Sequence, residues 1–422
     1  MKRFRTFLCI LLCLCLCLGA FAACAEKKDK KDRPQEIEIP TEDPNGTAKP
    51  QGTGQTTAAP KPAVTTPPKP SDRNTAFVIG ATGPLTGPAA FYGNEVKRGA
   101  ELAVAEINAA GGLKGGKFTF LMVDDQHQAD RIDSAYADLY EQGMQVSIGS
   151  VTSAPALEFV KKAQSNSLFI MGATATAKDL VKYSNTYRVC YGDNDLSVYT
   201  ANLLSEQYGK VGLLYQADDP YLQAEATAFT DQFMEISDAN RLVSRAFFPE
   251  TTDFSAQLQA FRDADCEAVY LLAYSPQIIR FLSLAADMNF EADYFGMEAF
   301  LDTGHMDTPN DPSAALLKQV NYLCDFHLEH ANDKAKAFIE SYREAYDTDP
   351  SVFAAYAYDA IYVLYEAMKQ TNITSLTISP GLLSQKLTDV FRDGFTYLGV
   401  TGEMSWSRNG SVIKEPLLIS FS

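Results

Sequence analysis

The stretch Thr75-Ala-Phe-Val-Ile-Gly80, followed by Ala81-Thr-Gly-Pro-Leu-Thr-Gly-Pro88, decides the fold. The apolar run that ends in glycine predicts a buried strand. The loop after it is rich in turn residues. From Glu95 to Ala109 apolar side chains recur at helical spacing, and Gly111-Gly112 stops that helix. A buried strand, a turn and an amphipathic helix in this order indicate an α/β domain.

The same alternation continues along most of the chain. Further strands are predicted at 118–123, 145–149, 168–172, 211–215, 242–248, 267–273, 293–297 and 320–325. Strands separated by helices favour largely parallel sheets. Roughly 350 globular residues exceed one comfortable core, so we expect two lobes.

Composition excludes some partners. The chain has 422 residues, a formal net charge of −17 and 46% hydrophobic residues. Such an acidic protein should not bind nucleic acid or anionic membranes through a broad basic surface. We therefore expect no nucleic-acid partner.

The first 24 residues have the pattern of a secretory signal: a positive start, an apolar run from Phe7 to Ala23 and small residues at its end. Phe21-Ala22-Ala23-Cys24 resembles the bacterial lipobox, which implies that Cys24 is lipidated and anchors the protein to the outside of the bacterial cell membrane. Ordinary cleavage near Ala22 is the alternative. Residues 25–74 are rich in Pro, Thr and Lys and lack aromatic residues, which predicts a disordered tether.

Cysteine usage agrees with an export signal. Five of the eight cysteines lie within the first 24 residues. Cys190, Cys266 and Cys324 remain, without the C-x-x-C spacing of a zinc site. We expect small buried residues, although one pair could bond after export.

Motifs for catalysis are missing from the sequence. It has no G-x-S-x-G elbow, no phosphate-binding G-x-x-x-x-G-K-[ST] loop and no H-E-x-x-H. A dinucleotide-binding enzyme is the strongest alternative among enzymes. The glycine-rich segment 80–87 follows a strand, and Asp124 ends the next strand, where a ribose-binding acid would lie. The spacing is not G-x-G-x-x-G, however, and Pro84 interrupts the turn. We expect no enzyme activity, cofactor or metal.

An ordered set of segments resembles a known family. It comprises Gly83-Pro-Leu-Thr-Gly-Pro-Ala-Ala-Phe-Tyr-Gly93, Gly99-Ala-Glu-Leu-Ala-Val-Ala-Glu-Ile-Asn-Ala-Ala-Gly-Gly112, Val123-Asp124-Asp125, Ile148-Gly149, Ala173-Thr174-Ala175-Thr176-Ala177, Ala273-Tyr274-Ser275-Pro276, Phe295-Gly296-Met297-Glu298 and Phe353 to Tyr365. Together they are similar to the leucine/isoleucine/valine-binding proteins, which are type I periplasmic binding proteins.

The resemblance implies an α/β fold of two Rossmann-like lobes with parallel sheets, joined by a three-stranded hinge. Lobe one would hold 75–193 and 328–415, and lobe two 194–327 and 416–422. A ligand would bind in the cleft between the lobes and select their closed state.

Binding residues are carried over one at a time. Ser153 matches the serine that takes the ligand carboxylate, and Ala154-Pro155 after it suggests a helix N-terminus that attracts an anion; a plain cap is the alternative. Thr176 matches a threonine that contacts both charged ends, with Thr174 and Ala175 beside it. Glu298 matches the acid that pairs with the ammonium group. The remaining matches are Tyr92, Tyr221 and Tyr274 around the cleft, Asp193 at a lobe crossing, and Val151, Thr152 and Phe353 in the side-chain pocket.

Thr152 replaces a cysteine that some relatives pair with a residue aligned near His127, so that disulfide is expected to be absent here. As a whole, the resemblance implies an importer component that captures a branched-chain or similar small α-amino acid. Its partners would be an ABC permease and ATPase, and we expect a monomer. Two alternatives stay open: a ligand sensor acting with a receptor, and an importer component for an amide, urea or aromatic acid.

Overall fold

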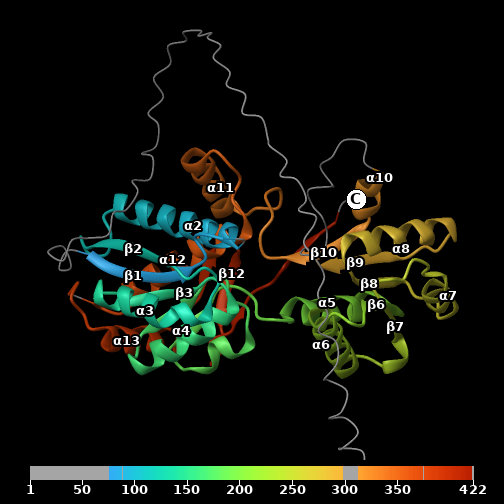
Figure 1. Cartoon of the computed structure of the whole chain (residues 1–422), viewed down its shortest axis with the longest axis horizontal. Helices are drawn as coiled ribbons and strands as arrows, with labels where there is room; N and C mark the ends of the chain where they lie inside the picture. The colour runs from blue at the N-terminus through green and yellow to red at the C-terminus, as the bar shows by residue number, and fades with distance from the viewer. Residues whose placement is uncertain (1–75, 88, 298–311, 374, 421–422) are drawn as a thin grey trace, which may run out of the picture. The chain divides into compact units, whose positions relative to one another are not determined.

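The computed structural model describes residues 76–87, 89–297, 312–373 and 375–420 (Figure 1). The predicted signal segment with Cys24, the tether 25–74 and the predicted ligand residue Glu298 lie outside the described residues.

The first sheet of the described chain is entirely parallel. Its strand order is β2-β1-β3-β4-β5. The strands are β1 (Ala76–Gly83), β2 (Lys117–Asp124), β3 (Val146–Ser150), β4 (Phe169–Gly172) and β5 (Thr186–Arg188). The helices of this part are α2 (Ala90–Ala109), α3 (Ile132–Glu141), α4 (Ser153–Ser165), α11 (Asp333–Tyr346), α12 (Val352–Gln370) and α13 (Pro380–Arg392).

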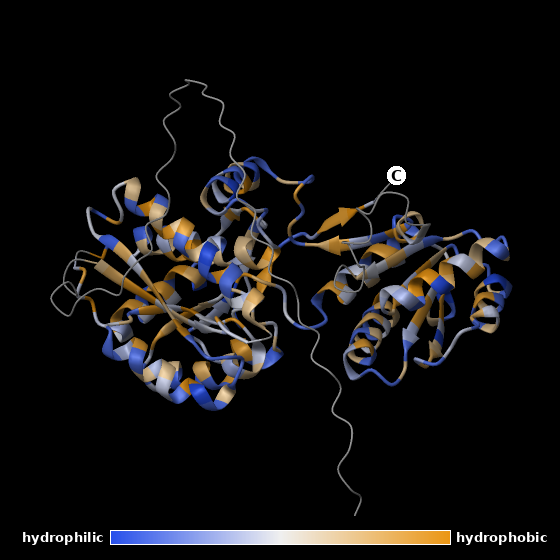
Figure 2. Ribbon diagram, turned by 45° about the horizontal axis from the view of Figure 1, so that its top comes forward, coloured by the Kyte–Doolittle hydropathy of each residue, from blue (hydrophilic) through white to orange (hydrophobic). Residues whose placement is uncertain are grey.

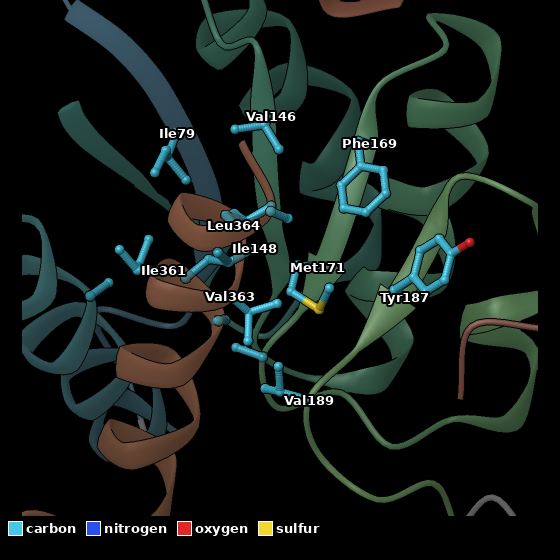
Figure 3. Packing of buried hydrophobic residues seen from close by; sticks show 14 of the residues in the cluster. Ile79, Val146, Ile148, Phe169, Met171, Tyr187, Val189, Ile361, Val363 and Leu364 are labelled. Atoms are coloured by element: carbon cyan, nitrogen blue, oxygen red, sulfur yellow. The ribbon is translucent and has the colours of Figure 1, made fainter. Parts of the chain in front are cut away.

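Strand β1 separates two hydrophobic cores, because successive side chains of a strand point to opposite faces. Phe77 and Ile79 join the core under α2 and α12, whereas Val78 joins the core under α3 and α4. Figure 3 shows the first core, where sheet side chains meet Ile361 and Leu364 of α12. Cover on both faces explains why the inner strands β1 and β4 are buried at every position.

The second sheet has the order β14-β10-β9-β8-β6-β7 within the described residues. Its strands are β6 (Val211–Gln216), β7 (Leu242–Phe247), β8 (Ala268–Leu272), β9 (Asp293–Met297), β10 (Val320–Cys324) and β14 (Leu417–Ile419). All neighbours are parallel except β14, which pairs antiparallel with β10. The helices are α5 (Asp195–Gln207), α6 (Pro220–Ile236), α7 (Ser255–Asp263), α8 (Ser275–Asp287) and α10 (Pro312–Leu317).

Alternation again divides the packing of this sheet. Val269 and Leu271 of β8 lie in the core with α7 and α8, whereas Tyr270 and Leu272 lie in the core with α5 and α6. In Figure 2 the strands carry much of the hydrophobic colour, and the outer helix turns and loops much of the hydrophilic colour.

A small antiparallel sheet follows α13. It is formed by β11 (Tyr397–Gly399), β12 (Gly402–Trp406) and β13 (Val412–Ile413). These strands and β5 were not predicted, because runs of two to five residues give little measurable periodicity. Strand β14 falls in the segment 416–422, where the resemblance implied a last strand. The predicted α/β class with two largely parallel sheets is confirmed; the lobe boundaries stay a prediction.

The three cysteines of the described chain are buried, as expected from their bland sequence context. Cys190 and Cys266 are free thiols. Burial raises the pKa of each of these two thiols to about 11, so both are protonated and unreactive at neutral pH. Within the described residues, no helix is long and apolar enough to cross a membrane.

Candidate functional site

The loops after β3 and β4 form one half-site, held by hydrogen bonds between them. The Thr174 hydroxyl donates to the carbonyl oxygen of Val151 at 2.7 Å. The Ala177 N–H donates to Oγ of Ser153 at 3.3 Å. Carboxyl ends of parallel strands meet at one edge of a sheet, so residues from these two loops become neighbours.

Helix α4 begins at Ser153, and Thr152 is its N-cap residue. Pro155 is thus the third helical residue, whereas the sequence had suggested that it is the first. A proline still fits there, because the first four N–H groups of a helix have no partner within the helix. The capping alternative for Ser153 is also wrong, since Ser153 lies inside the helix and its hydroxyl oxygen accepts from Ala177. The helix N-terminus with this hydroxyl is suited to an anion.

Thr176 is exposed, and two hydrogen bonds to its carbonyl oxygen hold its backbone in place. Its carbonyl oxygen accepts from Arg188 Nη1 at 2.8 Å and from the Asp193 N–H at 2.9 Å. The Arg188 side chain is buried and lies 3.7 Å from the Asp195 carboxylate. Arg188 was missed by sequence reasoning, although a lone arginine in an apolar strand segment is a signal that a buried partner exists.

Two aromatic residues of the predicted pocket pack against each other. Tyr92 of α2 and Phe353 of α12 make an edge-to-face contact with ring centroids 4.9 Å apart. Tyr92 keeps 42% of its surface exposed. The adjacent Gly93 lets the helix start close to the loop, because a Cβ there would lie 1.9 Å from the Pro84 carbonyl oxygen. The pair is therefore ordered but open to solvent.

The expected loss of a disulfide near Thr152 has a structural counterpart. Oγ1 of Thr152 lies 2.9 Å from Nδ1 of His127, so the structure brings together the two positions that the resemblance had related. His127 has a left-handed backbone, with φ of 61°, and its N–H donates to Asp125. A side-chain hydrogen bond thus joins these two loops.

Asp124, which a dinucleotide site would need for a ribose, is already engaged. Its carboxylate accepts from the Leu85 N–H at 2.8 Å and from the Thr86 hydroxyl at 2.6 Å. Although partial burial raises the pKa of Asp124, these bonds outweigh it and the pKa is lowered. Asp124 fixes the loop after β1, which disfavours the rival dinucleotide interpretation.

A second half-site lies at the carboxyl ends of β6 and β8. The Tyr274 hydroxyl donates to Oδ2 of Asp219 at 2.8 Å, and Oδ1 of Asp219 accepts from the N–H groups of Tyr221 and Leu222. Partial burial raises the pKa of Asp219, but the bonds from Leu222, Tyr274 and Tyr221 outweigh it and the pKa is lowered. Asp219 therefore stays ionised, caps α6 and orients Tyr274.

Tyr221 and Tyr274 are exposed at this edge by 46% and 41%. Burial, followed by the neighbouring carboxylates of Glu225 and Asp193, raises the pKa of Tyr221. Asp193 is exposed, its N–H donates to the Thr176 carbonyl oxygen, and its negative charge contributes to the raised pKa of Tyr221.

The structure thus brings together two groups of predicted residues. The first comprises Val151, Thr152, Ser153, Thr174, Ala175 and Thr176, and the second Tyr221 and Tyr274 with Asp193. Asp219 was missed, although Asp before Pro at the start of an apolar periodic segment is a recognisable cap signal. The placement of Glu298 lies outside the described residues.

The chemistry of the two half-sites differs. The first offers backbone and hydroxyl donors, and the second offers the Asp219 carboxylate with the Tyr274 hydroxyl bound to it. Among the described residues, no group of three or more His, Cys, Asp or Glu side chains could hold a metal ion. The arrangement favours recognition of a molecule with one acceptor end and one donor end.

Comparison with known proteins gives a consistent result. A family model described as "Periplasmic binding protein" matches residues 77–418. The chain is 31% identical to the Leu/Ile/Val-binding protein BraC3 of Rhizobium johnstonii over 204 residues, which cover 48% of this chain and 55% of that protein. It is 24% identical over 297 residues, 69% of this chain and 78% of that one, to the leucine-, isoleucine-, valine-, threonine- and alanine-binding protein of Pseudomonas aeruginosa. The match with the Rhizobium protein spans about half the length of that relative.

Solved structures share the fold. An ABC transporter substrate-binding protein from Desulfitobacterium hafniense in complex with Leu has a TM-score of 0.62 at 22% identity, covering 81% of this chain and 96% of that one. A solute-binding protein from R. palustris in complex with benzoate has a TM-score of 0.56 at 20% identity, covering 82% and 93%. Amino-acid and aromatic-acid binders are therefore about equally similar in fold.

Proposed function

Because this chain belongs to the periplasmic binding protein family, we propose that it is the extracytoplasmic substrate-binding protein of an ABC importer. We propose further that its ligand is a free α-amino acid, branched-chain or similarly small. The two half-sites would close on the ligand from opposite ends, as a hinge motion that the ligand selects.

One observation carries the choice of an amino acid over an aromatic acid: the Tyr274 hydroxyl gives its proton to Asp219. A phenol has one proton, so any further hydrogen bond that Tyr274 makes must be accepted by its oxygen. An acceptor next to an ionised aspartate suits an ammonium group and repels a carboxylate. An aromatic acid without an amino group has nothing to donate there.

The opposite end of the ligand would be held by α4. The Ser153 oxygen accepts from Ala177, which leaves the Ser153 proton to donate to a carboxylate. The first N–H groups of α4 and the positive end of its dipole act in the same direction. Thr176, exposed and supported by Arg188, would supply a further hydroxyl.

The side chain of the ligand would lie against Val151, Thr152, Tyr92 and Phe353. The Thr152 hydroxyl bonds to His127, which lessens its tendency to bind a polar ligand group. This supports a small apolar side chain. Glu298 stays a predicted partner of the ammonium group, and its replacement by Ala should weaken amino-acid binding strongly.

Anchoring through a lipid at Cys24 belongs to the same proposal. The tether 25–74 would let the binding domains reach an ABC permease with its ATPase while the protein remains on the outer face of the membrane. Mass spectrometry of the mature N-terminus tests this: a lipid-modified Cys24 is expected, and an unmodified residue near 22–24 would contradict the anchor.

A thermal-shift screen of the purified protein against the twenty amino acids, with benzoate as the aromatic-acid control, tests the ligand class. A ligand at about 100 times its Kd adds roughly 2.7 kcal/mol of stability, so a true ligand gives a clear rise in Tm. We expect a rise with one or more small apolar amino acids. A rise with benzoate alone would overturn the amino-acid proposal. Uptake of labelled ligand by cells with and without this protein separates transport from sensing. Transport predicts that uptake falls when the protein is missing, whereas sensing predicts that it does not.

A further inference from the structure

The imidazole of His127 contacts a hydroxyl that the N-terminus of α4 leaves uncommitted. Nδ1 of His127 lies 2.9 Å from Oγ1 of Thr152. Thr152 is the N-cap residue of α4, yet its side chain makes no capping hydrogen bond to the helix. The imidazole is therefore the partner that the geometry gives to this hydroxyl. Thr152 also directly precedes Ser153, which is proposed to hold the ligand carboxylate.

The turn that carries the imidazole is anchored through its backbone. The His127 N–H donates to Oδ1 of Asp125 at 2.9 Å, and Asp125 is fully buried. The carbonyl oxygen of Asp125 accepts from the Gln128 N–H, also at 2.9 Å. His127 itself has a left-handed backbone with φ of 61° and is exposed to solvent. The ring is thus held beside Thr152 and can still exchange its proton with water.

The charge of His127 determines the direction of its hydrogen bond with Thr152. A neutral imidazole has one N–H group and one acceptor nitrogen, whereas an imidazolium donates from both nitrogens. With a neutral ring, Nδ1 can accept the proton of Thr152. With a charged ring, Nδ1 must donate, so Oγ1 of Thr152 accepts and the hydroxyl proton is free for another acceptor. Histidine is the side chain that ordinarily changes charge between pH 5 and pH 8.

We propose that His127 is a specificity-determining residue, which sets whether the Thr152 hydroxyl can donate a hydrogen bond to the side chain of the ligand. This inference rests on the proposed function, in which Thr152 lines the side-chain pocket. While His127 is neutral, its ring holds the Thr152 proton and the pocket favours a purely apolar side chain. When His127 is charged, the pocket gains a donor and also accepts a side chain with an acceptor oxygen.

Other charged groups that could act on the ring come from its own segment and the short 3-10 helix Ala129–Arg131, namely Asp124, Asp125, Asp130 and Arg131. The loop before α4 and the first turn of α4, residues 151–157, contain no charged residue. Burial raises the pKa of Asp125, although the hydrogen bond from the His127 N–H opposes the rise. A substitution at His127 that leaves Asp125 in place therefore separates the two groups.

Calorimetric titration with L-isoleucine and with O-methyl-L-threonine, at pH 8 and at pH 5, tests the inference. The two amino acids have the same shape, but the second has an ether oxygen in place of one methylene group, and an ether can only accept. Their charged ends are identical, so changes in binding at those ends cancel in the ratio of the two affinities. The protein should prefer isoleucine at pH 8. This preference should fall by about fivefold at pH 5, the effect of gaining one neutral hydrogen bond.

Two variants should abolish this pH dependence. His127→Asn does not titrate in this range, and asparagine tolerates a left-handed backbone better than most residues. Thr152→Val keeps the shape of the side chain and removes the hydroxyl. In each variant the ratio of affinities should be the same at both pH values. His330→Asn, at an exposed histidine of another segment, is the matched control and should keep the wild-type shift.

A wild-type ratio that does not change with pH overturns the inference. A change that persists in His127→Asn or in Thr152→Val overturns it as well, since another titrating group then carries the effect. In each of these cases isoleucine still binds, so the proposed function stands. Failure of the wild-type protein to bind any amino acid at either pH overturns the proposed function, and this inference with it.

Discussion

The Lys414 ammonium lies 3.3 Å from Oδ2 of Asp325, and the two side chains are only 0% and 2% exposed. Asp325 follows β10 and Lys414 precedes β14, its antiparallel neighbour. The Lys414 nitrogen also lies 5.1 Å and 5.0 Å from the ring centroids of Tyr191 and Tyr356. Tyr356 donates a hydrogen bond to Asp325. The pair thus fixes two chain segments that are about 90 residues apart in sequence, within a low-dielectric surrounding.

Replacement of Lys414 by Met should be strongly destabilising. Removing one partner of a buried ion pair leaves the other charge uncompensated, which costs about 3–5 kcal/mol of unfolding free energy. Urea denaturation followed by circular dichroism measures the loss. Lys336→Met removes a pair that is 63% and 100% exposed and should change stability by less than about 0.5 kcal/mol. Equal stability of the two variants would contradict a structural role for the buried pair.

The deficit of Lys414→Met should depend on pH. Burial raises the pKa of Asp325, and the Lys414 charge opposes that rise. A carboxyl whose folded-state pKa is raised destabilises the fold above that pKa, and the penalty disappears as pH falls through it toward the unfolded value of about 3.9. The gap between variant and wild type should therefore narrow on acidification. A gap that widens toward pH 4 would show that Asp325 does not carry the uncompensated charge.

Asp219→Ala should destabilise the protein and weaken ligand binding together. Loss of an Asp N-cap costs about 0.5–2 kcal/mol, and Tyr274 loses its acceptor. Because the folded-state pKa of Asp219 is lowered, its stabilisation is complete above the unfolded pKa of about 3.9 and is lost as pH falls through the folded value. Thermal unfolding between pH 7 and pH 2.5 should show the two proteins converging. Asp218→Ala, at the exposed neighbouring position, should leave both stability and binding near wild type.

Ser153→Ala should weaken binding of the preferred amino acid by about tenfold or more, because a hydroxyl donor to a carboxylate contributes roughly 1.5–3 kcal/mol. The fold should tolerate the change, since the lost protein contact is one 3.3 Å bond from Ala177. Ser165→Ala, at the exposed end of the same helix, is the control. Calorimetry that finds the two variants equal to wild type would remove Ser153 from the ligand site.

Gly399→Ala should be destabilising by more than about 1 kcal/mol. A Cβ at this position would lie 2.5 Å from both carboxylate oxygens of Asp359. That buried carboxylate accepts from the N–H groups of Val400 and Thr401 at 2.8 Å and 2.9 Å, so it cannot move away cheaply. Gly381→Ala meets only Ser167, at 3.6 Å, and lies in the first turn of α13, where it should be neutral or slightly stabilising. Chemical denaturation of both variants gives the comparison.

Much of the fold could be read from local patterns. Nine strands of the two large sheets were predicted from apolar runs, and central strands such as β4 and β8 are buried at every position because both of their faces are covered. From the same pattern we expected the site in loops 80–94, 149–155, 172–179 and 296–300; Tyr274, after β8, was expected only from the family resemblance. Short antiparallel strands such as β11 and β13 were not predicted, since so few residues carry no pattern of their own and the strands depend on pairing with β12.

Site residues divide in the same way. Ser153, Thr176 and Tyr274 could be found because their segments resemble a family in an ordered series. The support of Thr176 by Arg188 and of Tyr274 by Asp219 could not be foreseen, because each partner is supplied by another segment.

The sequence by itself determined the α/β class, the number of large sheets and which loops could reach a ligand, since strand and helix patterns depend on neighbouring residues. Only the tertiary structure decided whether each hydroxyl of the site can donate a hydrogen bond to a ligand or can only accept one. That direction is set by the partner that folding places beside it, Asp219 for Tyr274 and Ala177 for Ser153. Such partners are distant in the chain and close in space, and hydrogen bonds act only at short range.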